Sequence, residues 1–588
     1  MAPVEPNAPS HKRRLSEPTA EGPTDAIEVD RSGAPSLDES MDVPGESMQE
    51  SEYTPSRPPS VLDDSNPMDL DEDVAMEGNR LDQLAQWTIQ SCFVGRSYEE
   101  CHLSQFRNSI FYGEQKVPVT LNRAKFYQKR PSYVLEEGSS KELDPEMTLQ
   151  GMLVEFGQMD SNRLGRVLPE ESAKKLAVER GQEIIPCRWV NTYKASKDVV
   201  RCRCVVQQVS AGAGTAVSLG ISSPTASVDG LKMVLALAGY FGSFLGALDV
   251  SCAFMASPLP MGFHQIVRLP AGTVDSNGRP VYVDLIKAMN GLRVSPRAWM
   301  MYISDIIQTQ CGLSANLIEP SLFAGWTSVE GLDSEFVNIL VYVDDLLIRT
   351  ETEAMYEKLV ALLKHEIQIN ETGRLGIKQK GELNFLGRRI WREAQSDAVH
   401  VGMKEGFFED MFGLLMVSGL KPCDAVPQIR SQLDSVDPAN NKELSPEQAT
   451  AYRSVLGRMA WLAPFRADLC FAMSQLAVGQ STPMIKHEKA LKAVSRYVKG
   501  TAHLCQTFPI PDVGSLYHQE GMHEFSLVSY CDASFAPMSN NGRKSVSGGL
   551  TIWLNSCIKS YARTQSVVAQ SSAEAELIGV VEMTTESH

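Results

Sequence analysis

The sequence predicts an α+β fold, in which strands and separate helices share the chain, from three patterns. Residues 199–206 alternate Arg201 and Arg203 with Cys202 and Cys204, the period of two that is typical of a half-buried strand. Residues 336–349 hold two apolar runs joined by a two-residue acidic tip, which predicts a β-hairpin. Residues 296–310 begin with proline and have the pattern of an amphipathic helix.

A chain of 588 residues predicts more than one domain, because a single hydrophobic core rarely grows beyond roughly 250–300 residues. Residues 1–80 are rich in Pro, Ser, Glu and Asp and contain few aromatic residues. Such a segment cannot bury enough apolar surface to offset the entropy of ordering, so we expect a disordered acidic tail there. Residues 81–170 give mixed, partly helical signals, and the patterns sharpen from Ile184 onward.

The formal net charge of −17 is unusual for a protein that binds nucleic acid, because phosphates attract cations. Most of this charge lies in residues 1–80, which hold 19 acidic and 6 basic residues, a net charge of −13. The rest of the chain therefore carries only −4, and basic residues cluster locally within it, as in residues 486–499. The global charge does not exclude a basic groove.

The twelve cysteines form no CxxC pair and no regular framework, which predicts a reduced protein inside the cell, in the cytoplasm or the nucleus. No apolar run approaches the roughly 20 residues that span a bilayer, so we expect no membrane partner. Lys12, Arg13 and Arg14 are a weak candidate for a nuclear import signal.

The pattern along the chain predicts further elements in a definite order. A helix is expected over residues 231–244, followed by a strand over 245–250 that ends near Asp249. After the hairpin at 336–349 we expect a helix over 353–367, a strand and turn that begin at 384–387, helical stretches over 446–477 and 483–500, strands over 525–530 and 545–554, and a helix over 573–582.

Asp344 and Asp345 at the hairpin tip, together with Asp249 at another strand end, are candidate metal ligands. Carboxylates crowded together repel one another, and one of their pKa values rises. A hard divalent cation removes this conflict, and Mg²⁺ prefers carboxylate oxygens. Two such ions about 3.5–4 Å apart can activate an attacking hydroxyl and stabilise the leaving oxygen. An ordinary solvated turn is the alternative interpretation of the Asp-Asp pair.

A series of short motifs runs along residues 184–580. They are Arg188–Val190 with Arg201–Arg203, Ser223–Thr225, Leu248–Phe254, Gly291–Trp299, Tyr342–Asp345, Phe385–Gly387, Tyr452–Asp468 and Tyr497–Thr501. Each motif is weak alone, but their order is that of the Pol polyprotein of Ty1/copia-type retrotransposons, which the chain therefore resembles. The resemblance implies an RNA-directed DNA polymerase, a nucleotidyltransferase with the right-hand fold of palm, fingers and thumb followed by a helical connection.

The resemblance also implies the polymerase site. Asp249, Asp344 and Asp345 would be the catalytic carboxylates that hold two Mg²⁺ (or Mn²⁺) ions, and the Val250 carbonyl would be a further metal ligand. Phe254 would exclude a ribose 2′-hydroxyl and so select deoxynucleotides. A plain core phenylalanine is the alternative for Phe254.

Other residues would bind the nucleotide and the primer by the same resemblance. Arg201 and Arg203 would face the triphosphate, with a solvated strand face as the alternative, and Asn290 and Gly291 would lie at the nucleotide pocket. Phe385, Leu386 and Gly387 would contact the primer. The expected partners are an RNA or DNA template with its primer, deoxynucleoside triphosphates, and other Pol segments such as integrase and protease or further copies of the chain.

A second resemblance, to ribonuclease H, rests on Tyr530–Ser534, Arg543–Gly548 and Val568–Glu576. It implies that Asp532 and Glu576 are metal ligands, with Glu576 a better choice than Glu574. The chain ends twelve residues past Glu576, whereas the family supplies further carboxylates there. We therefore expect a truncated α/β domain with weak or absent ribonuclease H activity.

The resemblance predicts this organisation: a disordered tail at 1–80, an uncertain region at 81–170, fingers and palm at 171–415, thumb and connection helices at 416–510, and a partial ribonuclease H-like domain at 520–588. Asn290, Val294 and Ala467 depart from the family's usual residues. The missing ribonuclease H end and the altered Asn290 motivate a second hypothesis, that of a degenerate relic that binds only nucleic acid or partners. An unrelated two-metal nuclease is a third interpretation, against which the Phe254 spacing argues.

Overall fold

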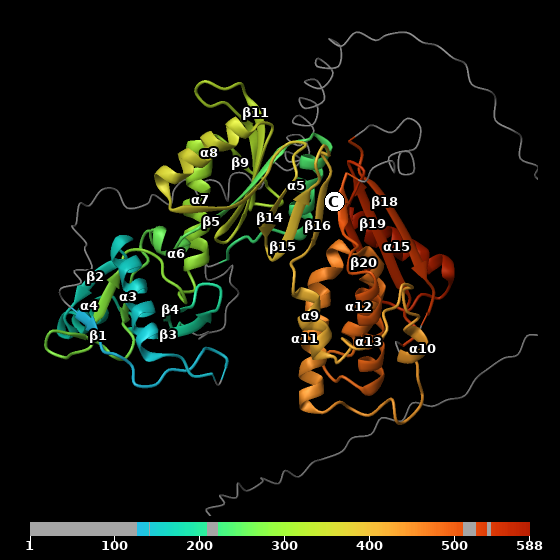
Figure 1. Ribbon diagram of the computed structural model, residues 1–588, viewed down its shortest axis with the longest axis horizontal. Coiled ribbons are helices and arrows are strands. Elements are labelled where there is room, and N and C mark those ends of the chain that lie inside the picture. The colour runs from blue at the N-terminus through green and yellow to red at the C-terminus, as the bar shows by residue number, and fades with distance from the viewer. Residues whose placement is uncertain (1–125, 140, 209–221, 510–524, 538–541, 588) are drawn as a thin grey trace, which may run out of the picture. The chain divides into compact units, whose positions relative to one another are not determined.

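The computed structural model describes residues 126–139, 141–208, 222–509, 525–537 and 542–587 (Figure 1). The expectations for residues 1–80, for Lys12–Arg14 and for most of 81–170 lie outside these ranges. Within them, helices and mostly antiparallel sheets confirm the predicted mixture of the two. No helix of the described segments is long and apolar enough to cross a membrane. Their ten cysteines are free thiols.

The first large sheet has five strands in the order β2-β8-β6-β3-β4. Its strands are β2 (Gly165–Leu168), β3 (Ile185–Lys194), β4 (Val199–Val206), β6 (Gln265–Arg268) and β8 (Tyr282–Leu285). The half-buried strand predicted over 199–206 is confirmed as β4, with Cys202 and Cys204 buried and Arg201 and Arg203 exposed, and it pairs antiparallel with β3. Helices α3 (Pro145–Ser161) and α4 (Glu170–Glu179) precede β3, and a small pair of β1 (Phe126–Gln128) and β7 (Thr273–Asp275) stands apart.

The second sheet has six strands in the order β13-β5-β12-β11-β10-β9. Its strands are β5 (Phe244–Val250), β9 (Ser314–Ala315), β10 (Leu322–Thr327), β11 (Glu335–Tyr342), β12 (Asp345–Thr350) and β13 (Ile369–Leu375). The helices next to this sheet are α5 (Val228–Tyr240), α6 (Ala253–Ala256), α7 (Ser295–Cys311) and α8 (Glu353–Glu366). The predicted helix at 231–244 ends earlier than expected, because Gly242 adopts a left-handed φ of 60° and Phe244 already begins β5.

Apolar side chains cover both faces of the six-stranded sheet. Leu245, Ala247 and Leu347 pack in one core cluster with α5. Their strand neighbours Leu248 and Leu346 pack in a second cluster with α7 and α8. Because side chains alternate along a strand, Asp249 and Asp345 both project from the α5 face.

Helix α8 approaches β5 closely at Gly246. A Cβ atom at this position would lie 2.1 Å from the ring of Tyr356, a fully buried side chain of α8. The strand therefore requires glycine here, and the close contact fixes β5 against the helix three residues before Asp249.

A third sheet carries the strands β14 (Gly381–Phe385), β15 (Arg388–Arg392), β16 (Val399–Met403) and β17 (Gln506–Phe508) in that order. The expectation that a strand begins at 384 was wrong, because β14 ends at Phe385. Leu386 and Gly387 form the two-residue turn to β15, with φ values of 49° and 71°. Such turns require positive φ, which explains the glycine.

Between β16 and β17 the chain is helical. The helices are α9 (Phe407–Leu414), α10 (Arg430–Leu433), α11 (Pro446–Leu462), α12 (Cys470–Ala477) and α13 (Ile485–Gly500). The helical stretch predicted at 446–477 is interrupted at 463–469 by two 3₁₀ turns, the first of which contains Pro464. Proline lacks the amide that an α-helix needs at such a position.

The last sheet has the strands β18 (Val528–Ser534), β19 (Val546–Trp553) and β20 (Ser556–Thr564) in sequence order. Helix α15 (Ser572–Ser587) packs against β18 and β19 (Figure 1). In the described part of the chain, β18 has a partner strand on one side only, so its other edge presents backbone groups without a strand partner.

Candidate catalytic site

The register of the six-stranded sheet brings two carboxylates together. Asp249 at the end of β5 lies directly opposite Asp345 at the start of β12. Side chains at directly opposite positions have Cβ atoms roughly 4.5–5.5 Å apart, and these two share one face of the sheet. Asp344 precedes Asp345, and its carbonyl oxygen accepts a hydrogen bond of 2.7 Å from the Val250 amide. Residues almost a hundred positions apart thus come together where two inner strands of the sheet end.

The hairpin tip differs from the expected one by a single position. Tyr342 pairs with Asp345, so the two-residue turn consists of Val343 and Asp344. The prediction of a tip formed by both aspartates was therefore wrong: Asp345 is the first residue of β12. Val343 is exposed and has a left-handed φ of 53°, a conformation that β-branched residues rarely adopt.

The carboxyl group of Asp345 is electrostatically strained. Its pKa is raised from 3.8 to about 6, chiefly by burial and in addition by the neighbouring Asp344 and Asp249 carboxylates. Lys404 opposes this shift. A half-buried carboxylate that has two like-charged neighbours favours either a proton or a cation.

The donor set fits a divalent metal ion by its chemistry. Three carboxylates from two strand ends supply the hard oxygen ligands that Mg²⁺ and Mn²⁺ prefer. As the side chains stand, no group of three or more His, Cys, Asp or Glu in the described ranges is close enough to hold an ion. Backbone register therefore brings Asp249, Asp344 and Asp345 together, while their carboxylates do not form a ready-made cluster.

The structure places Phe254 on α6, in the turn that follows β5. Its side chain is half-buried and packs against two core clusters, one shared with α7 and α8 and the other centred on the five-stranded sheet. Its carbonyl oxygen accepts hydrogen bonds from the amide and the hydroxyl group of Ser257. The aromatic ring is thus fixed a few residues beyond Asp249, where its proposed role in selecting the sugar stays a prediction.

Arg201 and Arg203 lie on the exposed face of β4, in the same electrostatic neighbourhood as Asp249. Burial raises the pKa of the nearby Cys252 thiol; Arg201 and Arg203 oppose that rise and Asp249 adds to it. Both the arginines and the aspartate are therefore close enough to Cys252 to act on it. The role of the two guanidinium groups in facing the triphosphate stays a prediction.

Asn290 and Gly291 hold the end of β4. The Asn290 carbonyl oxygen accepts a hydrogen bond of 2.8 Å from the Val206 amide. Gly291 has a φ of 88°, and a Cβ atom there would lie 2.1 Å from the Val206 carbonyl oxygen, so no larger residue fits. These contacts involve the backbone, which explains why the departure from the usual residue at 290 leaves the local fold intact.

The residues expected to contact the primer are unequally accessible. Phe385 is buried in the core cluster beneath the third sheet, and Leu386 packs partly against the same cluster. Only Gly387 is exposed. If this turn meets a primer, its backbone and Gly387 are the parts that can reach it.

The two carboxylates predicted for the ribonuclease H-like segment come from β18 and α15. Because side chains alternate along a strand and Ala533 packs against α15, the Asp532 side chain projects from the other face of β18. Asp532 is exposed on β18, and the Glu576 carboxylate on α15 accepts a hydrogen bond of 3.1 Å from the amide of the next residue, Ala533. Glu574 instead accepts a hydrogen bond from the Gln570 amide at the start of the helix. The choice of Glu576 over Glu574 as a metal ligand stays a prediction.

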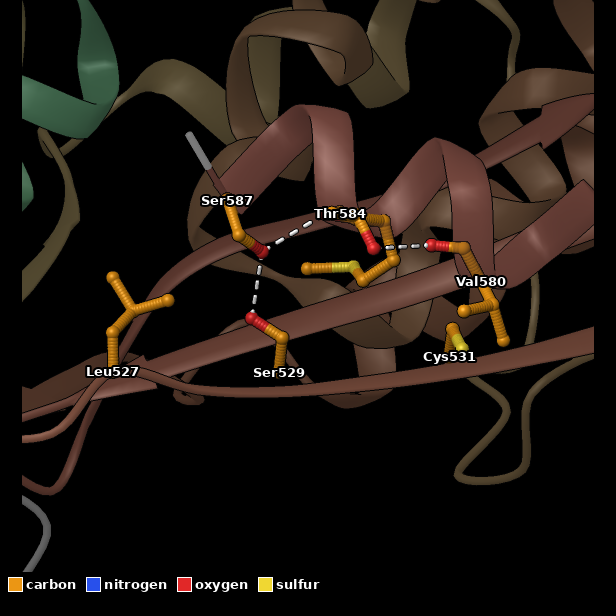
Figure 2. A pocket seen from close by; sticks show the side chains of 7 residues that line it. Leu527, Ser529, Cys531, Val580, Thr584 and Ser587 are labelled. Atoms are coloured by element: carbon orange, nitrogen blue, oxygen red, sulfur yellow. Dashed lines mark hydrogen bonds between the residues drawn. The ribbon is translucent and has the colours of Figure 1, made fainter.

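A shallow pocket of about 330 Å³ lies between β18 and α15 (Figure 2). Neither Asp532 nor Glu576 lines it. It is lined by Leu527, Ser529, Cys531, Val580, Met583, Thr584 and Ser587. The Ser529 and Ser587 hydroxyl groups are 2.8 Å apart and join the two elements at one end.

The basic residues of α13 have structural partners that sequence reasoning missed. Arg496 donates to the Lys421 carbonyl oxygen at 2.7 Å, and Lys499 donates to the Leu420 carbonyl oxygen at 2.8 Å. Lys489 donates to the Asn440 side chain. Much of the cluster at 486–499 therefore fastens loops 418–424 and 440 to the helix.

Two motifs of the helical segment meet in a buried network. Arg466, which is 4% exposed, donates to the Asp468 carboxylate and to the Thr501 carbonyl oxygen. The Tyr497 hydroxyl donates to Asp468 at 2.8 Å. These residues hold α13 against the 3₁₀ turns, so their recurrence as motifs reflects the packing of this segment.

Comparisons with known proteins show which proteins the chain is similar to. A family model described as reverse transcriptase (RNA-dependent DNA polymerase) matches residues 174–399. The chain is 29% identical over 408 residues to the retrovirus-related Pol polyprotein from transposon RE2 of Arabidopsis thaliana. It is 24% identical over 436 residues to the one from transposon TNT 1-94 of Nicotiana tabacum.

These alignments cover 68% and 72% of this chain but only 26% and 31% of the two relatives. The chain therefore spans about a quarter to a third of their length. Among solved structures, the protease-reverse transcriptase of prototype foamy virus is similar at a TM-score of 0.21 and 13% identity, over 75% of this chain and 53% of that one. At this score the likeness supports no conclusion about the chain.

Proposed function

Because residues 174–399 belong to the reverse transcriptase family and the chain is related to Ty1/copia-type retrotransposon Pol polyproteins, we propose that it extends a primer on an RNA template. The observation that carries this proposal is the cross-strand pair of Asp249 and Asp345, with Asp344 in the adjoining turn. The family consists of nucleotidyltransferases, and such an enzyme needs carboxylates at one point to hold the metal ions of phosphoryl transfer.

In this proposal, Asp249, Asp344 and Asp345 hold two Mg²⁺ or Mn²⁺ ions, with the Val250 carbonyl as a further ligand. The bound ions would lower the pKa of the primer 3′-hydroxyl and stabilise charge on the departing pyrophosphate. The strand ends supply these ligands from a sheet that is covered by apolar side chains on both faces. The chain's own contribution is to fix the positions of the three carboxylates.

Other residues position the nucleotide. The exposed Arg201 and Arg203 guanidinium groups bind the triphosphate of the incoming deoxynucleotide through charge-assisted hydrogen bonds. The half-buried ring of Phe254 lies against the sugar and excludes a 2′-hydroxyl, while Asn290 and Gly291 close the pocket beside β4. Gly387 and the turn backbone meet the primer.

We further propose an organisation that follows the sheets. The five-stranded sheet and α3 form the fingers, and the six-stranded sheet with the third sheet forms the palm, together covering 171–415. The helices within 416–510 form the thumb and connection, and 520–588 is a ribonuclease H-like segment in which Asp532 and Glu576 bind metal. The partners are a template with its primer, deoxynucleoside triphosphates, and other Pol segments or copies of the chain.

The test is extension of an oligo(dT) primer on poly(rA) with dTTP and either Mg²⁺ or Mn²⁺. We expect extension by the native chain and a loss of roughly a thousandfold or more in Asp344→Asn, because this variant removes a metal ligand and keeps the side-chain volume. Asp333→Asn, an exposed aspartate in a loop of the same sheet, is the matched control and should keep native activity.

A folded native chain that fails to extend the primer with either ion would contradict the proposal and favour the degenerate relic. Folding is checked by a cooperative unfolding transition of the same preparation. Binding to the template and primer, measured at the same salt concentration, separates loss of chemistry from loss of the complex.

A further inference from the structure

We infer that Trp299 is the positioning residue of the acidic turn: its indole N–H holds the Val343 carbonyl and thereby sets the place of Asp344 and Asp345. This inference rests on the proposed polymerase function and deepens it. Trp299 lies on α7, far from both aspartates in sequence, and its indole Nε1 donates a hydrogen bond to the Val343 carbonyl oxygen. Nothing in the sequence pattern alone pairs these two residues.

Trp299 is itself rigidly held. Its side chain is 1% exposed and packs in the core cluster formed by α7, α8 and one face of the six-stranded sheet. The helix that carries it is anchored one turn earlier. There the Ser295 hydroxyl donates to the Met289 carbonyl oxygen at 2.7 Å and accepts from the Met289 amide at 3.1 Å. The indole N–H therefore points to the turn from a fixed support.

The turn needs such support because its first residue is strained. Val343 adopts a left-handed φ of 53°, a conformation that is unfavourable for a β-branched residue. Its side chain is 38% exposed and contributes little packing of its own. A residue keeps such a conformation only where contacts with the surrounding structure hold it in place.

The surroundings supply two hydrogen bonds from outside the hairpin. Trp299 binds the Val343 carbonyl, and the Val250 amide binds the next carbonyl, that of Asp344, at 2.7 Å. The second bond ties the turn to β5 directly beside Asp249. Both carbonyls of the two-residue turn are thus fixed, one by helix α7 and one by the strand that carries the third carboxylate.

The alternative is that the hydrogen bond to Val343 serves only to give the buried indole N–H an acceptor. In that case, removing the donor would change the stability of the fold but would leave the turn in place. Trp299→Phe separates these cases because it removes the donor and keeps an aromatic ring in the core. We expect kcat for primer extension to fall roughly 10–100-fold with the KM for dTTP changed less than about threefold, since a small misplacement of ligands affects the reacting geometry most. Trp326→Phe, a half-buried tryptophan on β10 of the same sheet, is the matched control.

A second measurement does not depend on activity. Hydrogen exchange should become faster in Trp299→Phe at peptides covering 249–252 and 342–346, because the Val250 amide donates to the Asp344 carbonyl. Protection elsewhere in the sheet should stay native. If the native chain shows no extension, the proposed function fails, yet the exchange data still test the positioning.

A second substitution keeps the inference testable if the tryptophan variant is poorly folded. Glycine adopts positive φ without cost, so Val343→Gly should reduce the turn's dependence on Trp299. We expect Trp299→Phe/Val343→Gly to recover at least part of the lost kcat and of the lost protection, a coupling that a double-mutant cycle measures. A kcat for Trp299→Phe within twofold of native, a general loss of protection across the sheet, or no coupling with Val343→Gly would each overturn the inference.

Discussion

Two pairs of carboxylates, one on β5 and β12 and the other on β18 and α15, have different surroundings. Asp249 and Asp345 belong to a six-stranded sheet whose two faces are both covered by helices and apolar side chains. Asp532 lies on a strand with one partner strand in the described ranges, and Glu576 already accepts a backbone hydrogen bond. In the first pair the Asp345 carboxyl is electrostatically strained, whereas in the second pair the Glu576 carboxylate is partly satisfied by the backbone.

The difference shows what turns acidic side chains into a metal site. Burial and like charges raise the pKa of Asp345 to about 6, so ionising this carboxyl in the folded state is unfavourable. A bound cation offsets this cost by stabilising the negative charge. The Ala533 amide donates a hydrogen bond to the Glu576 carboxylate and so stabilises part of its negative charge. This carboxylate therefore gains less from a bound cation. We therefore expect metal ions to affect the folding stability of the chain mainly through the β5–β12 site.

The largest expected effect concerns Asp345 in the absence of metal. Its folded pKa of about 6 exceeds the ordinary value of 3.8, so the folded state binds more protons than the unfolded state between these values. The native chain therefore loses stability as pH rises through this window, and Asp345→Asn does not. In EDTA at pH 8 we expect the variant to be more stable by about 1–2 kcal/mol, a range discounted because the carboxyl is half-exposed.

Urea unfolding at pH 4, 6 and 8 measures this difference. The gain of Asp345→Asn over native should be near zero at pH 4 and complete by pH 8, because other groups titrate alike in both chains. Asp333→Asn should show no such trend, since that side chain is exposed. If the stability gain of Asp345→Asn were independent of pH, the Asp345 carboxyl would not be strained. The two sites would then not differ in the way proposed.

Sequence reasoning found these carboxylates because strand endings have local signatures. Apolar runs that lead into Asp249 and Asp344 mark strand ends, and an alternating pattern marks the hairpin that carries Arg201 and Arg203. The register that sets Asp249 opposite Asp345 depends on side-chain packing between strands about a hundred residues apart. No local pattern encodes that pairing.

The errors have equally physical causes. The turn between β11 and β12 takes one aspartate rather than two, because tight hairpins close with two residues and Val343 occupies the first position. The interruption of the helix at 463–469 was readable from Pro464. The role of Trp299 was not readable, since a buried indole N–H reveals its partner only once the fold is known.

The second prediction concerns how much Mg²⁺ stabilises the fold through each of the two carboxylate pairs. At pH 8 the ionised carboxylates bind Mg²⁺ only in the folded state, so Mg²⁺ at ten times its dissociation constant should stabilise the native chain by about 1.4 kcal/mol. Asp345→Asn should show less than half of this gain, and Glu576→Gln should show most of it. At pH 5 the native gain should shrink, because Asp345 is then largely protonated. Equal stabilisation of the native chain and Asp345→Asn would place the ion elsewhere.

The smallest effect tests the second pair. Glu576→Ala removes the acceptor of the Ala533 amide and should cost about 1 kcal/mol locally, whereas the amide oxygen of Glu576→Gln can still accept this bond. Hydrogen exchange of peptides that cover 530–536 reports the change, and we expect faster exchange in Glu576→Ala alone. Unchanged exchange in Glu576→Ala would mean that the carboxylate is not committed to the backbone. Glu576 would then be as free as Asp345 to bind a cation, and the contrast between the two pairs would fail.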